Sequence, residues 1–254
     1  MPGPDLRTFA SLEELSRAAA ARFAEFCQER LARESIFTAA LSGGSTPKRL
    51  YEILGGPEFS GSIPWPRVHL FQADERCVPP DHAESNYRMI RETLLDRVRI
   101  PQSNVHRVQA ELANPEESAE FYAQELNRMF RPKPGGIPNL DLVFLGMGPD
   151  GHTASLFPGS AALAERVKWV SANFVEKLHA NRVTLTYPLL NAAREVIFLV
   201  AGHEKAEILR QVLEGPHEPE RLPSQGIRPA DGRLSWYVDA AAAGRLKNAT
   251  GSAG

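Results

Sequence analysis

The chain has 254 residues, of which 43% are hydrophobic and 24% are charged, and this composition excludes an intrinsically disordered protein. With a net charge of -2 the protein has no overall positive potential that would attract nucleic acid or an anionic membrane, so we expect neither as a partner. Its two cysteines, Cys27 and Cys77, are too few and too far apart for a disulfide framework or a zinc knuckle. Residues 1–6 lack the basic and apolar regions of a signal peptide, and no apolar run is long enough to span a membrane. We therefore expect a cytoplasmic protein.

Short apolar strands alternate with helices along the chain. In chain order, the spacing of apolar residues and the turn residues predict helix 11–32, strand 36–41, a helix from 47, strand 68–73, helix 86–95, a helix from 115, strands 140–145, 169–174, 182–186 and 196–200, helix 204–213, strand 234–238 and a short alanine-rich helix. This alternation is typical of a Rossmann-like, doubly wound α/β fold, in which helices cover both faces of a mostly parallel sheet. We expect one such domain over residues 1–254, with an ordered core at about 8–247. Ligands in these folds bind at the carboxyl ends of the strands, so the loops there are the candidate sites.

The loop after the strand at 36–41 has the composition of an anion-binding turn. Gly43 and Gly44 allow the backbone to turn tightly, Ser42 and Thr46 carry hydroxyl groups, and the helix that begins near Pro47 points its free N–H groups at the loop. The spacing is not that of a Walker A motif. An ordinary strand-to-helix turn accounts for these residues equally well, so the loop alone does not decide between the two interpretations.

Two further groups of charged residues are candidates for substrate binding. Asp74, Glu75 and Arg76 follow the second strand, where Arg76 could pair with a phosphate or hold the two carboxylates in place. Arg182 begins a later strand, and Lys205 lies in an early helical turn, where the helix dipole disfavours a cation. Taken singly, each of these residues is more simply explained as a surface charge.

The loop from Gly146 to Pro158 carries the strongest signal in the sequence. Five of its residues are glycine or proline, which bend the backbone and bring it close to other groups. His152 lies two residues after Asp150, and a carboxylate at this spacing can fix the imidazole tautomer and support its protonated form. We therefore expect His152 and Asp150 to be catalytic. One histidine with no second ligand at helical or C-x-x-C spacing predicts no metal.

The same loop fits the pattern G-x-G-x-x-G but does not predict a dinucleotide site. The residues that follow it are a poor start for the required helix, and the strand at 169–174 offers no acidic residue for a ribose. We therefore expect no dinucleotide at this loop.

Several segments, in this order, resemble the 6-phosphogluconolactonase family, which shares its fold with glucosamine-6-phosphate deaminases. They are Leu41–Pro47, Asp74–Pro79, Ser85–Tyr87, Gly146–Pro158, Arg182–Thr186 and Leu234–Asp239. The run from Asp150 to Pro158 is the most specific of them. The deaminase branch is expected to have His-Ile-Ala-Phe-Asn where this chain has His152-Thr-Ala-Ser-Leu156.

The resemblance implies hydrolysis of 6-phospho-D-glucono-1,5-lactone to 6-phospho-D-gluconate in the pentose phosphate pathway, without a metal or a cofactor. Under this hypothesis His152 activates a water and Asp150 orients His152. The residues that would hold the phosphate, or the negative charge that develops in the reaction, are Ser42, Gly43, Gly44, Thr46, Arg76, Arg182 and Lys205. Asp74 is expected to bind another part of the substrate. We expect a monomer or a small homo-oligomer whose partner is a phosphorylated sugar lactone.

Two alternatives stay open at this point. An amino sugar phosphate isomerase/deaminase would release ammonia from glucosamine 6-phosphate. A sugar-phosphate sensor would bind 6-phosphogluconate tightly and hydrolyse no lactone, although such sensors usually carry an additional domain for which we expect no room in this chain. The sequence also leaves open which of the three cations binds phosphate, and what Lys177 and His179 do.

Overall fold

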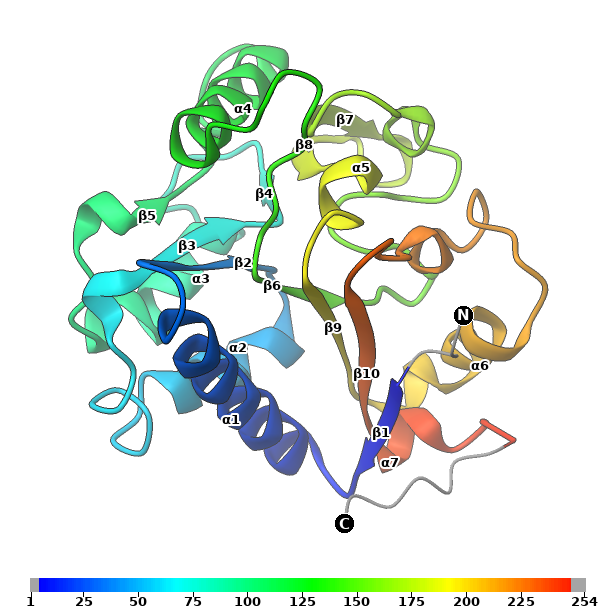
Figure 1. The fold of residues 1–254 in the computed structure, drawn as a ribbon. Helices are drawn as coiled ribbons and strands as arrows, with labels where there is room; N and C mark the ends of the chain where they lie inside the picture. Colours follow the sequence, from blue (N-terminus) through cyan, green and yellow to red (C-terminus); the bar gives the residue numbers. More distant parts are fainter. Residues whose placement is uncertain (1–4, 248–254) are drawn as a thin grey trace.

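A computed structural model describes residues 5–247, and its central element is a seven-stranded parallel sheet (Figure 1). The strand order is β1-β10-β9-β6-β2-β3-β5. The strands are β1 (Asp5–Phe9), β2 (Phe37–Leu41), β3 (Val68–Gln72), β5 (Val105–His106), β6 (Leu142–Gly146), β9 (Glu195–Val200) and β10 (Arg233–Asp239). The parts of the expected domain at 1–4 and 248–254 lie outside the described residues.

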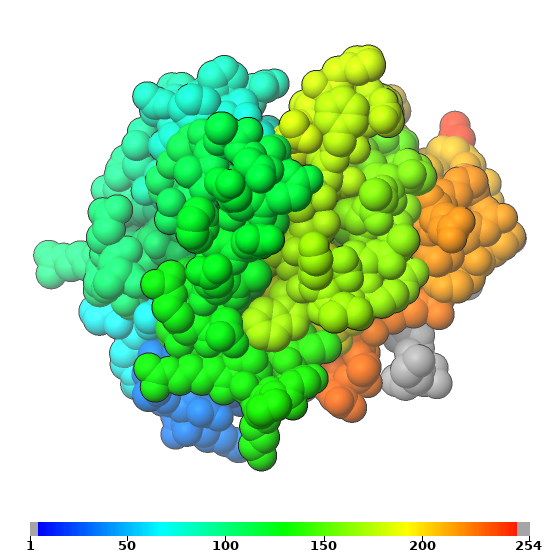
Figure 2. All heavy atoms as spheres, turned by 90° about the horizontal axis from the view of Figure 1, so that it is seen from above, coloured from blue at the N-terminus to red at the C-terminus, as the bar shows by residue number. Residues whose placement is uncertain are grey.

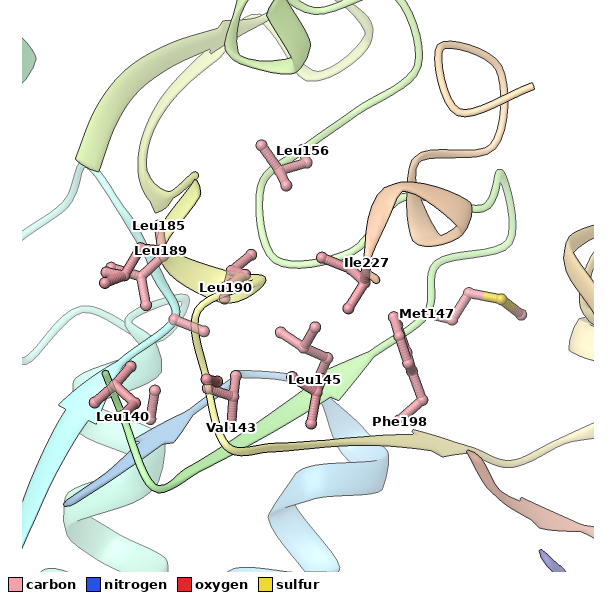
Figure 3. Packing of buried hydrophobic residues seen from close by; sticks show 14 of the residues in the cluster. Leu140, Val143, Leu145, Met147, Leu156, Leu185, Leu189, Leu190, Phe198 and Ile227 are labelled. Carbon is pink, nitrogen blue, oxygen red and sulfur yellow. The ribbon is translucent and has the colours of Figure 1, made fainter. Parts of the chain in front are cut away.

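Helices cover both faces of this sheet, because neighbouring strand residues point to opposite sides. On one face Leu142 and Phe144 of β6 pack against α1 (Leu12–Leu31), α2 (Ser45–Leu54) and α3 (Asn86–Thr93). On the other face Val143 and Leu145 pack with Phe198, Leu189 and Leu190 (Figure 3). The helices that share this second cluster are α4 (Pro115–Phe130), α5 (Tyr187–Leu190), α6 (Ala206–Glu214) and α7 (Ala240–Ala243). The predicted doubly wound α/β fold is confirmed. No helix within residues 5–247 is both long enough and apolar enough to cross a membrane.

A second, antiparallel sheet of three strands was not expected from the sequence. Its order is β4 (Asp74–Arg76), β8 (Ala180–Leu185) and β7 (Val170–Val175). Ala73 joins the two sheets, since its N–H donates to Leu41 O at 2.8 Å and its carbonyl accepts from Leu185 N at 2.8 Å. Helix α4 packs on β7, and the two segments lie side by side in the view from above (Figure 2).

Three expectations about individual elements were wrong. Asp74–Arg76 is a strand rather than the loop that follows the second strand. The strands β1 and β5 were missed, because β1 is largely polar and β5 has only two residues. Lys205 lies in a 3₁₀ turn (His203–Lys205) and precedes α6, which begins at Ala206, so it is not in an early turn of the α-helix.

The order of the strands reverses direction between β2 and β6. From β2 the chain proceeds outward to β3 and β5, whereas from β6 it proceeds the other way to β9 and β10. The carboxyl ends of β2, β6 and β9 are therefore neighbours at this reversal, which is where doubly wound folds form a crevice for ligands.

The opposite, amino end of the sheet is fixed to α1 by buried ion pairs. Arg22 donates to both carboxylate oxygens of Glu195, at 3.0 and 2.7 Å, and Arg30 donates to Asp141 at 2.8 Å. The second oxygen of Asp141 accepts from the N–H and the hydroxyl of Thr38, each at 3.0 Å. Glu195 and Asp141 are both buried, and each has cationic partners.

Candidate active site

A cavity of about 270 Å³ opens at the carboxyl ends of β2, β6 and β9. Eight of the ten predicted site residues line it: Ser42, Gly43, Gly44, Thr46, Asp74, Arg76, His152 and Lys205. Asp150 and Arg182 do not line it. Asp150 contacts His152. Arg182 of β8 lies directly opposite Arg76 in the register of β8 with β4.

The loop after β2 presents uncapped N–H groups to this cavity. Gly44 is the N-cap of α2 with a φ of 105°, a conformation that favours glycine, and no side chain caps the helix. Gly43 has no room for a side chain, since a Cβ there would lie 1.8 Å from Oδ1 of Asn86. The hydroxyl of Ser42 donates to Phe144 O at 2.8 Å and so links β2 to β6. The helix N-terminus, rather than the Ser42 hydroxyl, is the group best placed to donate to an anion.

The loop after β6 holds the predicted catalytic pair in direct contact. Nδ1 of His152 lies 2.5 Å from Oδ1 of Asp150. The imidazole ring stacks on Phe157 with a centroid distance of 4.0 Å, and a Cβ on Gly148 would lie 2.0 Å from the ring. The ring is therefore fixed by a carboxylate, by an aromatic face and by a glycine backbone.

The carboxylate of this pair stays ionised at neutral pH. Burial tends to raise the pKa of Asp150, but the hydrogen bonds and charge of His152, together with the hydrogen bond from Lys177, outweigh it and hold the pKa below its usual value. Because a carboxylate only accepts, Nδ1 of His152 carries the proton, which leaves Nε2 free to accept one.

Two arginines meet across the second sheet without a carboxylate between them. Arg76 of β4 and Arg182 of β8 are directly opposite each other. The Nε atoms of both are buried and have no hydrogen-bond partner within residues 5–247. Burial, and then the charge of Arg76, lowers the pKa of Arg182. Like charges opposite each other destabilise a sheet, so this arrangement suits an anion that binds both.

A third cation faces the cavity from the turn before α6. Lys205 lines the cavity, and burial lowers its pKa, although Glu204 and Asp150 act in the opposite direction. The structure therefore places cations on two sides of one cavity, with Arg76 on one side and Lys205 on the other.

The two carboxylates of β4 have different surroundings. Asp74 lines the cavity and accepts from the hydroxyl of Ser155 at 2.7 Å. Glu75 is buried and accepts from the N–H groups of Asn86 and Tyr87, each at 2.8 Å, which fixes the start of α3. The main-chain N–H of Arg76 donates to Oε1 of Glu75 at 2.8 Å, whereas Nη1 of its side chain donates to Glu84 O, so the Arg76 side chain is not needed to hold the two carboxylates in place.

Three residues near this site were not among the predicted site residues. Asn86 closes the cavity beside Gly43, Phe157 stacks on His152, and Lys177 pairs with Asp150 at 3.1 Å. The first two lie in segments that carry the family resemblance, which was the available signal for them. Within residues 5–247 no group of three histidine, cysteine or acidic side chains is arranged to hold a metal ion.

Known proteins resemble this chain over most of its length. The family model for glucosamine-6-phosphate isomerases/6-phosphogluconolactonase matches residues 10–236. The chain belongs to this family. A 6-phosphogluconolactonase from Nostoc sp. is 47% identical over 210 residues, which cover 83% of this chain and 85% of the relative. A human 6-phosphogluconolactonase is 43% identical over 246 residues, which cover 95% of this chain and 94% of the relative.

A solved structure has the same fold over almost the whole chain. The 6-phosphogluconolactonase from Trypanosoma cruzi superposes with a TM-score of 0.85 at 31% identity, and the match covers 96% of this chain and 97% of that one. The resemblance to the lactonase branch, noted from the sequence, is confirmed.

Proposed function

We propose that this chain hydrolyses 6-phospho-D-glucono-1,5-lactone to 6-phospho-D-gluconate, a step of the pentose phosphate pathway, and that His152 is its general base. One observation supports this site above all others. His152, in contact with Asp150, lines a cavity that the cationic side chains of Arg76 and Lys205 also line. Relatives named 6-phosphogluconolactonase, at 43–47% identity over most of the chain, support the substrate.

The reaction requires one group that first takes a proton as a base and then gives it back as an acid. Nε2 of His152 takes a proton from a water molecule as the oxygen of that water attacks the lactone carbonyl carbon. The tetrahedral intermediate then collapses, the bond from that carbon to the ring oxygen breaks, and His152 returns the proton to the ring oxygen. Asp150 keeps the imidazole in one tautomer and stabilises its protonated form between the two steps. The new carboxylic acid ionises in water.

The negative charges of the substrate are held by donors that lack a partner in the described residues, although Nη1 of Arg76 also donates to Glu84 O at 2.6 Å. Arg76 and Arg182 have buried Nε atoms available for the phosphate, and the N–H groups at the start of α2 can donate to it or to the oxyanion of the intermediate. Lys205 faces the same cavity. Asp74 is placed to accept from a sugar hydroxyl group.

The test is a lactonase assay on freshly made 6-phosphogluconolactone, corrected for spontaneous hydrolysis. We expect enzyme-dependent acid release, and no ammonia from glucosamine 6-phosphate. Ammonia release without lactonase activity would contradict the proposal, and so would tight binding of 6-phosphogluconate without turnover.

We further propose one domain, a cytoplasmic location, and a monomer or small homo-oligomer. The two cysteines, Cys27 and Cys77, are both free thiols, which is typical of proteins from a reducing compartment. Urea unfolding in a single transition, cell fractionation and sedimentation analysis test these three points.

A further inference from the structure

The connection between β7 and β8 reaches the catalytic pair from outside the cavity. It is a short 3₁₀ turn, Glu176–Leu178, which ends at His179 in a left-handed conformation with a φ of 45°. From this turn the Nζ of Lys177 lies 3.1 Å from Oδ2 of Asp150. The other oxygen of the same carboxylate, Oδ1, is the one that contacts His152 at 2.5 Å. One carboxylate thus lies between an ammonium group and the proposed base.

We propose that Lys177 is a positioning residue that acts through Asp150: its ammonium group binds Oδ2 of this carboxylate and weakens the stabilisation that Asp150 gives to protonated His152. This inference deepens the proposed function and rests on His152 as its base. Lys177 does not line the cavity, so it acts through Asp150 rather than by touching the substrate.

The physical reason is that a general base must be unprotonated before it reacts. A carboxylate in contact with an imidazole favours the imidazolium, and an ammonium group on the same carboxylate opposes this effect. The side chains of Asp150 and His152 are only 22% and 24% exposed, so their interaction is partly shielded from water. The Lys177 side chain is 67% exposed, so we expect its influence to be modest and sensitive to salt.

Other charged groups around the pair do not change when Lys177 is replaced. Those that line the same cavity are Asp74, Arg76, Glu204 and Lys205. Phe157 keeps its stacking contact with the imidazole as well. A difference between the wild type and a Lys177 variant therefore reports on Lys177 alone.

The direct test is the titration of the His152 imidazole, followed by NMR in the ligand-free protein. In Lys177→Gln we expect the midpoint to rise by about 0.2–0.7 pH unit, the range that exposed ion pairs support. Lys177→Arg keeps the charge and should titrate like the wild type. Lys133→Gln removes an exposed lysine from the connector before β6 and is the matched control, with no shift expected. At 1 M salt the shift of Lys177→Gln should shrink, because screening weakens the interaction.

Kinetics separate this role from a merely structural one. The acid limb of the kcat/KM profile of Lys177→Gln should move to higher pH by the same amount, while kcat on the alkaline plateau stays near that of the wild type. An unshifted His152 midpoint would overturn the inference, as would an equal loss of kcat at every pH. The NMR titration needs no turnover, so a shifted midpoint in a protein without lactonase activity would support the role of Lys177 and contradict the proposed function instead.

Discussion

Arginines at the amino end of the parallel sheet have different partners from those of the second sheet, which adjoins its carboxyl end. At the amino end Arg22 donates to both oxygens of buried Glu195. At the carboxyl end Arg76 and Arg182 face each other, and their buried Nε atoms have no partner within the described residues. A paired arginine such as Arg22 helps to fix a helix to the sheet. We propose that Arg76 and Arg182, whose Nε atoms lack partners within the described residues, bind the phosphate of the substrate instead.

This difference has an energetic consequence. Separating a buried pair leaves an uncompensated charge and destabilises the protein. Removing one of two like charges relieves a repulsion and costs no stability beyond the packing of the side-chain stem. The two ends of the sheet should therefore respond in opposite directions to the same kind of substitution.

The largest expected effect on activity is at the proposed base. His152→Ala should lose at least about 10² in kcat, the usual scale for a general base, while its urea midpoint stays near that of the wild type. His203→Ala, an exposed histidine in the turn before α6, is the matched control and should keep normal activity. Near-normal turnover by folded His152→Ala would contradict the mechanism.

The amino end should show a large effect on stability alone. Arg22→Met keeps much of the side-chain stem but leaves Glu195 buried without its main partner, so we expect the free energy of unfolding to fall by about 2–4 kcal/mol. Its kcat/KM at a temperature where it is folded should match the wild type. Urea unfolding measures the stability and steady-state kinetics measure the activity. A loss of activity without a loss of stability would contradict a purely structural role for Arg22.

The matched substitution at the carboxyl end should affect binding. Arg182→Met should lower kcat/KM for the phosphorylated lactone by roughly ten- to a hundredfold, since a charge-assisted hydrogen bond contributes about 1.5–3 kcal/mol. Unphosphorylated gluconolactone offers no dianion, so its hydrolysis should change far less. Equal losses with both lactones would show that Arg182 is structural or catalytic and that the phosphate site lies elsewhere.

The smallest expected effect is that of chelators. The described residues contain no cluster suited to a metal, and the proposed reaction uses only proton transfer and charge stabilisation. Activity should therefore survive exhaustive chelation and dialysis. A loss of activity that zinc specifically restores would contradict the mechanism.

The features that the sequence predicted are local ones. The loop from Gly146 to Pro158 was identified as a candidate site because its glycines and prolines, and the short spacing between Asp150 and His152, lie within one short segment of the sequence. The strand ends followed from apolar runs, and the parallel fold placed their loops together. Lys205 was selected because it was expected in an early helical turn, where the dipole disfavours a cation; it lines the cavity, although its turn is 3₁₀ rather than α-helical.

The features that the sequence did not predict depend on pairing between distant segments. Arg76 and Arg182 were separate candidates, and only the antiparallel register of β4 and β8 makes them neighbours. Lys177 reaches Asp150 because a hairpin turns back over the loop after β6. Apolar periodicity predicts that a strand forms but does not say which strand it pairs with, so the second sheet and its contacts required the structure.

Thermal unfolding of the wild type and of Arg182→Met, each with and without 6-phosphogluconate, tests the central claim most directly. The claim is that the unpaired arginines are kept for the phosphate group rather than for stability. We predict that Arg182→Met without ligand melts at or above the midpoint of the wild type, and that the ligand raises the midpoint of the wild type much more than that of the variant. A variant that melts well below the wild type without ligand, yet gains as much from 6-phosphogluconate, would contradict the account.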